Sequence, residues 1–368
     1  MANSKNKDGL GEFQVPALDY SLSRPAKIDY GIGCVGAGGI MRNTHLVAYH
    51  NLGLNVVAIT DAMPKVARET AQLRGVPTIY ASLSDLLDDA RIEIVDVAVP
   101  PHAQLEIVRE IVARSHIRGI LLQKPIAPNL AQAGEIVALC ERAGKKLGVN
   151  QNMRYEPGIR ALKILLSQGI LGIPILATIE MRVAMSWQSF MRNADRLMLL
   201  NMSIHHLDSF RFLFGDPTRV FASAQTDPRH PFAQDGSAFY TLEYADGLRA
   251  LGFDDSYGGP DRLTQAGENF VQWRVEGTQG MALGTVGWSK PSTLKFMTRQ
   301  KPDYWFEPRL SAVWFPDAFG ATMMQLIRAV DENSEPEIGG RDNLKTMAVV
   351  EACYQSLAEH RAVQVAYA

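Results

Sequence analysis

The sequence is poor in cysteine and has no excess of charge of one sign. Cysteine occurs only at Cys34, Cys140 and Cys353, with no CxxC pair. This odd number and wide spacing argue against a disulfide framework or a cysteine-based zinc site. We therefore expect the reducing cytoplasm as the compartment. The 37 Lys and Arg residues nearly balance the 39 Asp and Glu residues, which leaves no basic excess to bind a nucleic acid backbone.

Long hydrophobic runs are also missing. No apolar run reaches the roughly 18–20 residues that span a bilayer, and residues 1–11 lack the apolar core of a signal peptide. We therefore expect a small-molecule substrate and no membrane partner. With 46% hydrophobic and 21% charged residues, the 368-residue chain has the composition of a globular protein. Its length corresponds to about two domains.

The pattern of apolar residues divides the chain into three parts. Residues 1–27 form a polar N-terminal arm. From residue 28 to 149, short and nearly continuous apolar runs alternate with helix-length segments, as in a doubly wound α/β domain with a parallel sheet. The expected strands are 28–35, 55–60, 94–99, 119–122 and 147–149, and two of the expected helices are 103–115 and 129–143.

Residues 150–368 are predicted to form an α+β domain with a large, mostly antiparallel open sheet. Here longer strand-like stretches are separated by turn signals. The expected strands are 175–183, 220–224, 238–244, 248–253, 270–276 and 280–285, and the expected helices are 158–168, 319–333 and 342–360. The open face of such a sheet would expose apolar residues. We therefore expect a homodimer or homotetramer formed through this domain.

A glycine-rich turn, Gly36-Ala37-Gly38-Gly39-Ile40, directly follows the first predicted strand. Gly36 permits a tight turn, and Gly38 lets the backbone approach a pyrophosphate, which the following helix N-terminus would bind. A second register through Gly31 and Gly33 is rejected, because both precede the turn. A plain tight turn is the alternative. The position after the first strand of a βαβ unit favours dinucleotide binding.

Asp61 ends the second predicted strand, 22 residues after Gly39. A carboxylate there accepts hydrogen bonds from the adenosine ribose hydroxyls and repels a 2′-phosphate, so NAD is favoured over NADP. The alternative role, that of a helix-capping residue before Pro64, is compatible with the first.

Two segments carry candidate proton-transfer groups. Lys124 follows the strand at 119–122 and should lie where ligands bind in open α/β sheets, at the nicotinamide end. The alternative is a solvated loop lysine. In the helical segment 201–208, the residues Asn201, His205 and Asp208 share one stripe at i,i+4 and i,i+3 spacing. An amide, an imidazole and a carboxylate on one stripe could form a proton-transfer site. The simpler interpretation is that they form a polar helix face. No metal site is predicted.

These features in this order resemble the glucose–fructose oxidoreductase, inositol dehydrogenase and MocA (Gfo/Idh/MocA) family. The resemblance covers nearly the whole chain from Ile28 onward and rests on several short motifs. They are Gly36 to Ile40, Asp61, Gln123-Lys124-Pro125, Asn152-Met153-Arg154-Tyr155-Glu156-Pro157, Asn201 to Asp208, and Val275-Glu276-Gly277-Thr278-Gln279-Gly280.

The resemblance implies a Rossmann domain followed by a larger α/β domain, and oxidation of a sugar, sugar acid or cyclitol hydroxyl with NAD or NADP. By this analogy Lys124 and His205 are the catalytic residues. The expected cofactor-binding residues are Gly36, Gly38, Gly39, Ile40, Asp61, Pro100, Gln123, Lys124 and Asn152. The expected substrate-binding residues are Asn201, Arg154, Tyr155, Trp187 and Asp208, with Arg192 and Arg196 as further pocket candidates.

The sequence departs from the family pattern at two positions. Gln123 replaces the family's Glu before the lysine, and Asn201 replaces the Asp four residues before the histidine. Because an amide can neither accept a proton nor stabilise a cationic imidazole as a carboxylate does, we expect His205 to be the general base and Lys124 to polarise the same oxygen. The arginines hint at a carboxylated sugar, since guanidinium groups suit carboxylates; surface or interdomain roles are the alternative.

Two other classes of function remain open. In a redox-neutral enzyme, transient oxidation by NAD would activate a neighbouring bond for hydrolysis, elimination or isomerisation, with no net NADH. The third class is a non-catalytic dinucleotide-binding regulator, against which the presence of both Lys124 and His205 speaks.

Overall fold

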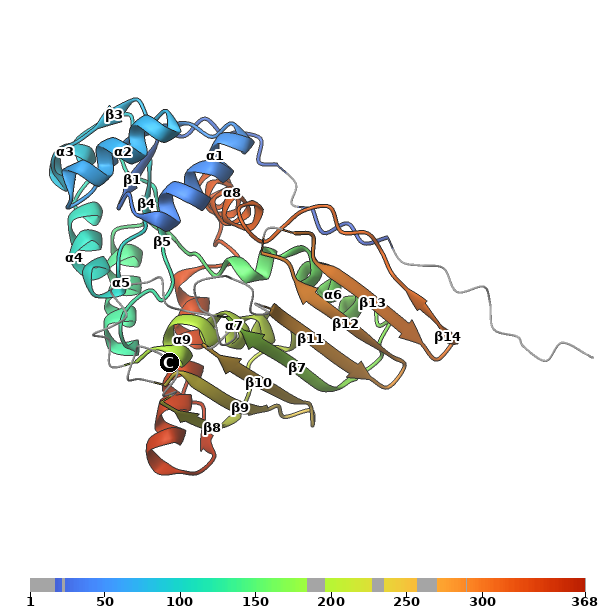
Figure 1. Cartoon of the computed structure of the whole chain (residues 1–368). Helices are drawn as coiled ribbons and strands as arrows, with labels where there is room; N and C mark the ends of the chain where they lie inside the picture. The colour runs from blue at the N-terminus through green and yellow to red at the C-terminus, as the bar shows by residue number, and fades with distance from the viewer. Residues whose placement is uncertain are drawn as a thin grey trace, which may run out of the picture.

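The computed structural model describes residues 17–21, 24–183, 196–226, 235–256, 270–288 and 290–367. These residues form two sheets, each with helices packed against it (Figure 1). No helix among them is long and apolar enough to span a membrane.

The first sheet has six parallel strands in the order β3-β2-β1-β4-β5-β6. Their bounds are β1 Ile32–Val35, β2 Val56–Thr60, β3 Thr78–Ile79, β4 Ile94–Val97, β5 Gly119–Leu122 and β6 Lys146–Val149. All residues of β1, β4 and β5 are buried, because helices cover both faces of the sheet. The five predicted strands are confirmed. The sixth strand, β3, has only two residues and was not predicted.

The helices around this sheet begin and end at sequence signals. Their bounds are α1 Leu46–Leu52, α2 Pro64–Arg74, α3 Leu83–Leu87, α4 Pro101–Val112 and α5 Leu130–Arg142. Asn129 caps α5 by accepting a hydrogen bond from the Gln132 N–H at 2.9 Å, as the sequence predicts. Proline occupies the first turn of α2 and α4, where its missing N–H has no cost.

The second sheet has nine strands in the order β14-β13-β12-β11-β7-β10-β9-β8-β15. Of the neighbouring strand pairs, β7 and β10 run parallel and the others antiparallel. The bounds are β7 Pro174–Arg182, β8 Arg219–Gln225, β9 Ser237–Glu243, β10 Arg249–Asp255, β11 Phe270–Gly277, β12 Gly280–Val286, β13 Thr293–Thr298, β14 Lys301–Phe306 and β15 Val363–Gln364. The predicted fold class, a Rossmann sheet plus a second, mostly antiparallel sheet, is confirmed.

Helices cover one face of the second sheet. They are α6 Pro157–Ser167, α7 Ser203–Phe214 and α9 Gly340–Glu359, which contact β12, β10 and β8 respectively. The opposite face carries apolar side chains that stay accessible. Phe221, Phe239 and Leu251 are 45%, 47% and 39% exposed, and Phe239 stacks on Phe253 with ring centroids 4.6 Å apart.

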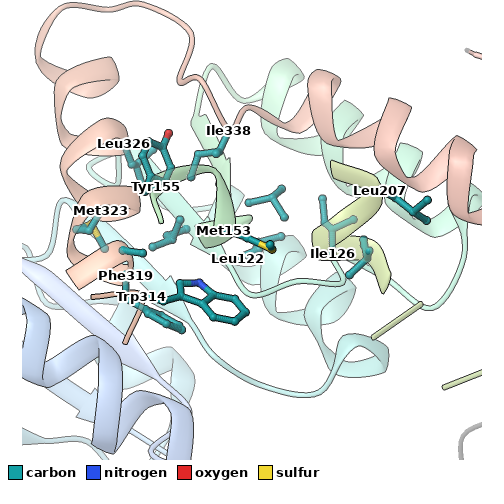
Figure 2. Packing of buried hydrophobic residues seen from close by; sticks show 14 of the residues in the cluster. Leu122, Ile126, Met153, Tyr155, Leu207, Trp314, Phe319, Met323, Leu326 and Ile338 are labelled. Atoms are coloured by element: carbon teal, nitrogen blue, oxygen red, sulfur yellow. The ribbon is translucent and has the colours of Figure 1, made fainter. Parts of the chain in front are cut away.

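Helix α8, Asp317–Asp331, follows the second sheet in sequence but packs on the first (Figure 1). It contacts β5 and β6, and Arg118 donates to the carbonyl of Val330 at 2.8 Å. Figure 2 shows Phe319, Met323 and Leu326 on this helix near the short segment that carries Met153 and Tyr155. Thus a helix from beyond the predicted boundary at residue 150 packs against the first sheet. That boundary stays a prediction.

Part of the predicted N-terminal arm contacts both halves of the chain. The Tyr20 hydroxyl accepts a hydrogen bond from the Ser311 N–H at 2.9 Å, and Arg24 donates to the Leu52 carbonyl at 3.0 Å. Residues 1–16 lie outside the described residues.

Candidate active site

The glycine-rich turn leaves β1 and opens a helix. Gly36 has φ of +89°, and a Cβ there would lie 2.5 Å from the Ala98 carbonyl oxygen, so only glycine fits. A Cβ at Gly38 or Gly39 would meet no heavy atom within 4 Å. The Gly38 carbonyl accepts the Arg42 N–H at 2.9 Å and starts the helix. The turn therefore offers open space beside a helix N-terminus, which fits a pyrophosphate.

Asp61 lies at the end of β2 and joins it to the glycine-rich turn. One carboxylate oxygen accepts the Ala37 N–H at 2.6 Å, and the other accepts the Met63 N–H at 2.7 Å. The predicted capping role is thus partly seen, because Asp61 orders the start of α2 without being its N-cap. Its partly exposed carboxylate stays at the edge of the turn, where a ribose would lie if a dinucleotide bound there.

Lys124 reaches from the first half of the chain to the second. It follows β5, and its Nζ donates to the backbone carbonyl of Asn201 at 2.5 Å and lies 3.4 Å from the Asn201 Oδ1. Burial lowers the pKa of Lys124 to about 7. The alternative of a freely solvated loop lysine is therefore wrong.

His205 lies on α7 and is 5% exposed. Its ring meets the Trp314 ring edge to face, with centroids 5.5 Å apart, and its Nδ1 has no hydrogen-bond partner among the described residues. Burial is the main cause that lowers the pKa of His205 well below its ordinary value, and the charges of Lys124 and His206 lower it further. Because its pKa is lowered, His205 is neutral at pH 7.

Lys124 affects His205 electrostatically, because its charge helps to lower the pKa of the His205 imidazole. Burial is the first cause that opposes the charged form of both groups. A state with both side chains protonated is therefore disfavoured near neutral pH.

Arg154 and Asp208 lie elsewhere, in a buried ion-pair cluster. The guanidinium group of Arg154 forms two hydrogen bonds of 2.6 and 2.7 Å with the Asp208 carboxylate. Arg154 also pairs with Asp342, and Thr346 donates to Asp208 at 2.6 Å. Both charged groups are used by the protein itself, so the structure does not support their predicted contact with substrate. The cluster anchors α7 to α9.

The other predicted site residues have mixed outcomes. Tyr155 is buried, and its hydroxyl has no hydrogen-bond partner among the described residues. Asn152 accepts the Trp314 indole N–H at 2.7 Å, which holds the ring beside His205. Arg196 pairs with Glu351 at 2.7 Å instead of facing a pocket.

Pro100 stands just before α4, at the carboxyl end of β4, the side of the sheet on which the glycine-rich turn and Lys124 also lie. Trp187 and Arg192 lie outside the described residues. Among the described residues, no group of three His, Cys, Asp or Glu side chains is arranged to hold a metal ion.

Two residues that contribute to the site, Trp314 and His45, were not predicted from the sequence. Trp314, in a loop before α8, packs on His205 although 109 residues separate them in the sequence. His45 lies fully buried behind the glycine-rich turn and contacts Gln123, the neighbour of Lys124. The sequence around an isolated Trp or His does not indicate such long-range contacts. The one sequence signal for His45 is its position on the helix that follows the glycine-rich turn.

The fold and site define a dinucleotide-dependent oxidoreductase, with a Rossmann sheet, a glycine-rich turn, a partly buried lysine and a buried histidine. Residues 30–151 match the Gfo/Idh/MocA oxidoreductase family, NAD-binding Rossmann fold, and residues 163–365 match the family's C-terminal alpha/beta domain. The chain belongs to this family, as its motifs predicted. The predicted NAD cofactor and the predicted oxidoreductase class are confirmed.

Named relatives and a solved structure resemble the whole chain. A D-apiose dehydrogenase of Paraburkholderia graminis is 33% identical, covering 90% of this chain and 88% of the relative. An inositol 2-dehydrogenase of Rhizobium meliloti is 24% identical, with 91% and 98% covered. An oxidoreductase from Agrobacterium radiobacter, solved with NAD+, L-tartaric acid and magnesium, has a TM-score of 0.79 at 23% identity and covers 92% of this chain and 98% of its own.

The first prediction concerns the glycine-rich turn. Gly38→Val should lower NAD affinity at least 100-fold while the fold survives, because its side chain would enter open space that the pyrophosphate needs. Calorimetric titration with NAD measures the affinity, and thermal unfolding checks the fold. Affinity within a few-fold of wild type in a folded variant would rule out this cofactor position.

The second prediction concerns Asp61. Wild-type protein should bind NAD at least 10-fold more tightly than NADP, and Asp61→Ala should narrow this ratio, because the carboxylate repels a 2′-phosphate. The variant also loses two hydrogen bonds from the backbone, which would weaken the binding of both cofactors. The ratio of the dissociation constants for NAD and NADP is therefore the quantity to measure. Glu69→Ala, on the exposed side of α2, is the control. Tighter NADP binding by wild type would contradict the assignment.

Proposed function

We propose that the protein is an NAD-dependent dehydrogenase that oxidises a hydroxyl group of a neutral sugar or cyclitol. The observation that carries the proposal is that Lys124, after β5, reaches the segment that carries the buried His205: its Nζ donates to the Asn201 carbonyl at 2.5 Å, one helical turn before His205. Relatives named D-apiose dehydrogenase and inositol 2-dehydrogenase support the substrate class.

The cofactor would be held by the carboxyl edge of the first sheet. The turn from Gly36 to Ile40 would bind the pyrophosphate and Asp61 the adenosine ribose. Pro100, Gln123 and Asn152 would lie along the nicotinamide half. When bound there, NAD supplies a hydride acceptor for the carbon that carries the reacting hydroxyl.

The protein's own part in the reaction is to take the hydroxyl proton. The sequence predicts that His205 accepts this proton while Lys124 polarises the same oxygen. With a cationic Lys124, the site would then hold two positive charges, and burial disfavours each of them. The structure instead favours a neutral pair in which Lys124 Nζ takes the proton and His205 binds the same oxygen. A lysine with a pKa of about 7 suits proton transfer near neutral pH. Asn201 would hold the resulting ammonium group through its carbonyl oxygens.

The substrate class follows from the arginines. Arg154 and Arg196, expected to favour a carboxylated sugar, are paired with Asp208 and Glu351. Of the predicted arginines only Arg192 is not placed by the structure. A neutral polyol therefore fits the described residues better than a sugar acid does.

Substrate oxidation can be tested with a panel that contains D-apiose, myo-inositol, other aldoses and their sugar acids. We expect NADH to accumulate, measured by absorbance, together with a product two mass units lighter than the substrate. Product without net NADH would indicate the redox-neutral class. NAD binding without any product would favour the non-catalytic regulator.

Removal of either catalytic side chain should lower turnover of the best panel substrate. We expect a loss of roughly 10²–10⁴-fold for His205→Ala, the range for a group that takes part in acid–base catalysis, with NAD affinity nearly unchanged. Lys124→Ala should impair both turnover and substrate affinity. Lys65→Ala, exposed on α2, is the control. Unchanged activity in both His205→Ala and Lys124→Ala would place the active site elsewhere.

We also propose that the chain forms a homodimer or homotetramer through the open face of the second sheet. Phe239→Glu, at the centre of the exposed apolar residues, should shift the mass in sedimentation toward the monomer. Met63→Glu, at an even more exposed apolar residue of the first domain, should not change the mass. A monomeric wild-type mass at micromolar concentration would contradict this proposal.

A further inference from the structure

A fully buried polar network lies directly behind the lysine turn. The His45 side chain and the Asp96 side chain are both inaccessible to solvent. His45 Nδ1 lies 2.8 Å from Asp96 Oδ2, and the Tyr49 hydroxyl donates to the same oxygen at 2.7 Å. Burial, and then the Asp96 charge, raise the pKa of Tyr49 well above its ordinary value, so its hydroxyl keeps the proton that it donates.

The His45 ring contacts polar groups through both of its nitrogens. Nδ1 faces the Asp96 carboxylate, which is an acceptor, so the geometry fits a proton on Nδ1. The other nitrogen, Nε2, faces the side-chain amides of Gln123 and Asn150, each at 3.2 Å. An amide N–H can donate to Nε2 when Nε2 has a free lone pair, which fits the same tautomer.

The network continues to the backbone of Lys124. With its amide nitrogen directed to His45, Gln123 presents Oε1 to the Lys124 N–H, which donates to it at 2.9 Å. From the opposite side, Gln104 of α4 donates to the carbonyls of Gln123 and Pro125 at 3.0 and 2.8 Å. The turn that carries Lys124 is thus fixed on both sides by buried hydrogen bonds.

We propose that His45, oriented by Asp96, is a positioning residue that fixes the Gln123 amide and, through it, the partly buried position of Lys124. His45 lies on the helix that opens at the glycine-rich turn, so the same helix would contact the cofactor and orient the proton acceptor. Gln123 is part of this arrangement, because its amide nitrogen faces His45 while its Oε1 accepts the Lys124 N–H. Only the expected loss of turnover rests on the proposed function; the positioning of Lys124 does not.

The variant His45→Asn separates orientation from folding. The Asn side-chain nitrogen takes the place of Nδ1 and keeps a donor for Asp96, but nothing takes the place of Nε2, so Gln123 and Asn150 lose their acceptor. Gln123→Met, which keeps the side-chain length without the amide, breaks the same link from the other side. His50→Asn is the matched control, since His50 is exposed on the same helix.

Lys124 itself is the reporter. Brief acetylation with acetic anhydride across a pH series, followed by peptide mass spectrometry, gives the pH at which half of the amine is reactive. Only the unprotonated amine reacts, so the midpoint for Lys124 in wild type should fall near 7, while the exposed Lys65 of the same sample serves as internal reference. This measurement requires neither substrate nor turnover.

We expect His45→Asn and Gln123→Met each to raise the Lys124 midpoint by one pH unit or more, because a released lysine turn returns toward solvent. The double variant should show no larger shift than either single one, and His50→Asn should match wild type. Turnover of the best panel substrate should fall at least 10-fold in His45→Asn with little change in NAD affinity. If His45→Asn does not fold, Gln123→Met gives the same test.

A Lys124 midpoint that stays at the wild-type value in a folded His45→Asn or Gln123→Met protein would overturn the inference. A shifted midpoint with unchanged turnover would support the positioning role of His45 and instead contradict the catalytic role of Lys124. The failure of this inference and the failure of the proposed function are therefore distinguishable.

Discussion

The contact between Lys124 and Asn201 is the interaction on which the site depends. It joins the end of β5 to the segment before α7, and it holds the partly buried amine of Lys124 between the two halves of the chain. Burial opposes the charged form of a lysine and lowers the pKa of Lys124 to about 7. Without the second domain, Lys124 would be a solvated loop residue.

The rest of the structure keeps the two domains in register around this contact. Helix α8 crosses back to pack on β5 and β6, and the buried pairs of Arg154 and Arg211 with acidic partners fix α7 against α9. Trp314 then fills the space beside His205 and is held by Asn152. Because desolvation offsets much of the attraction in a buried ion pair, we assign these pairs a role in fixing the relative position of the helices and not in raising stability.

The sequence predicts the local parts of this architecture well. Buried parallel strands, the glycine-rich turn, Asp61 and the position of Lys124 all follow from short-range patterns. The prediction for Asp208 lacks support because helical spacing shows which residues share a face but not which partner faces them. The prediction for Arg154 came from the family resemblance, which does not show that Asp208 is its partner. The contributions of His45, Trp314 and α8 depend on contacts between distant segments. The short strands β3 and β15 contain too few residues for a pattern.

The central claim, that the neutral Lys124–His205 pair accepts the substrate proton, is tested most directly by the pH dependence of hydride transfer. Single-turnover formation of NADH from the best panel substrate should be measured from pH 5 to 9 with wild-type protein. Because Lys124 must lose its proton before it can accept one from the substrate, the rate should rise with pH and level off above a pKa of about 7. A rate that falls as the pH rises through 7 would show that a cationic Lys124 is required, and would contradict the account.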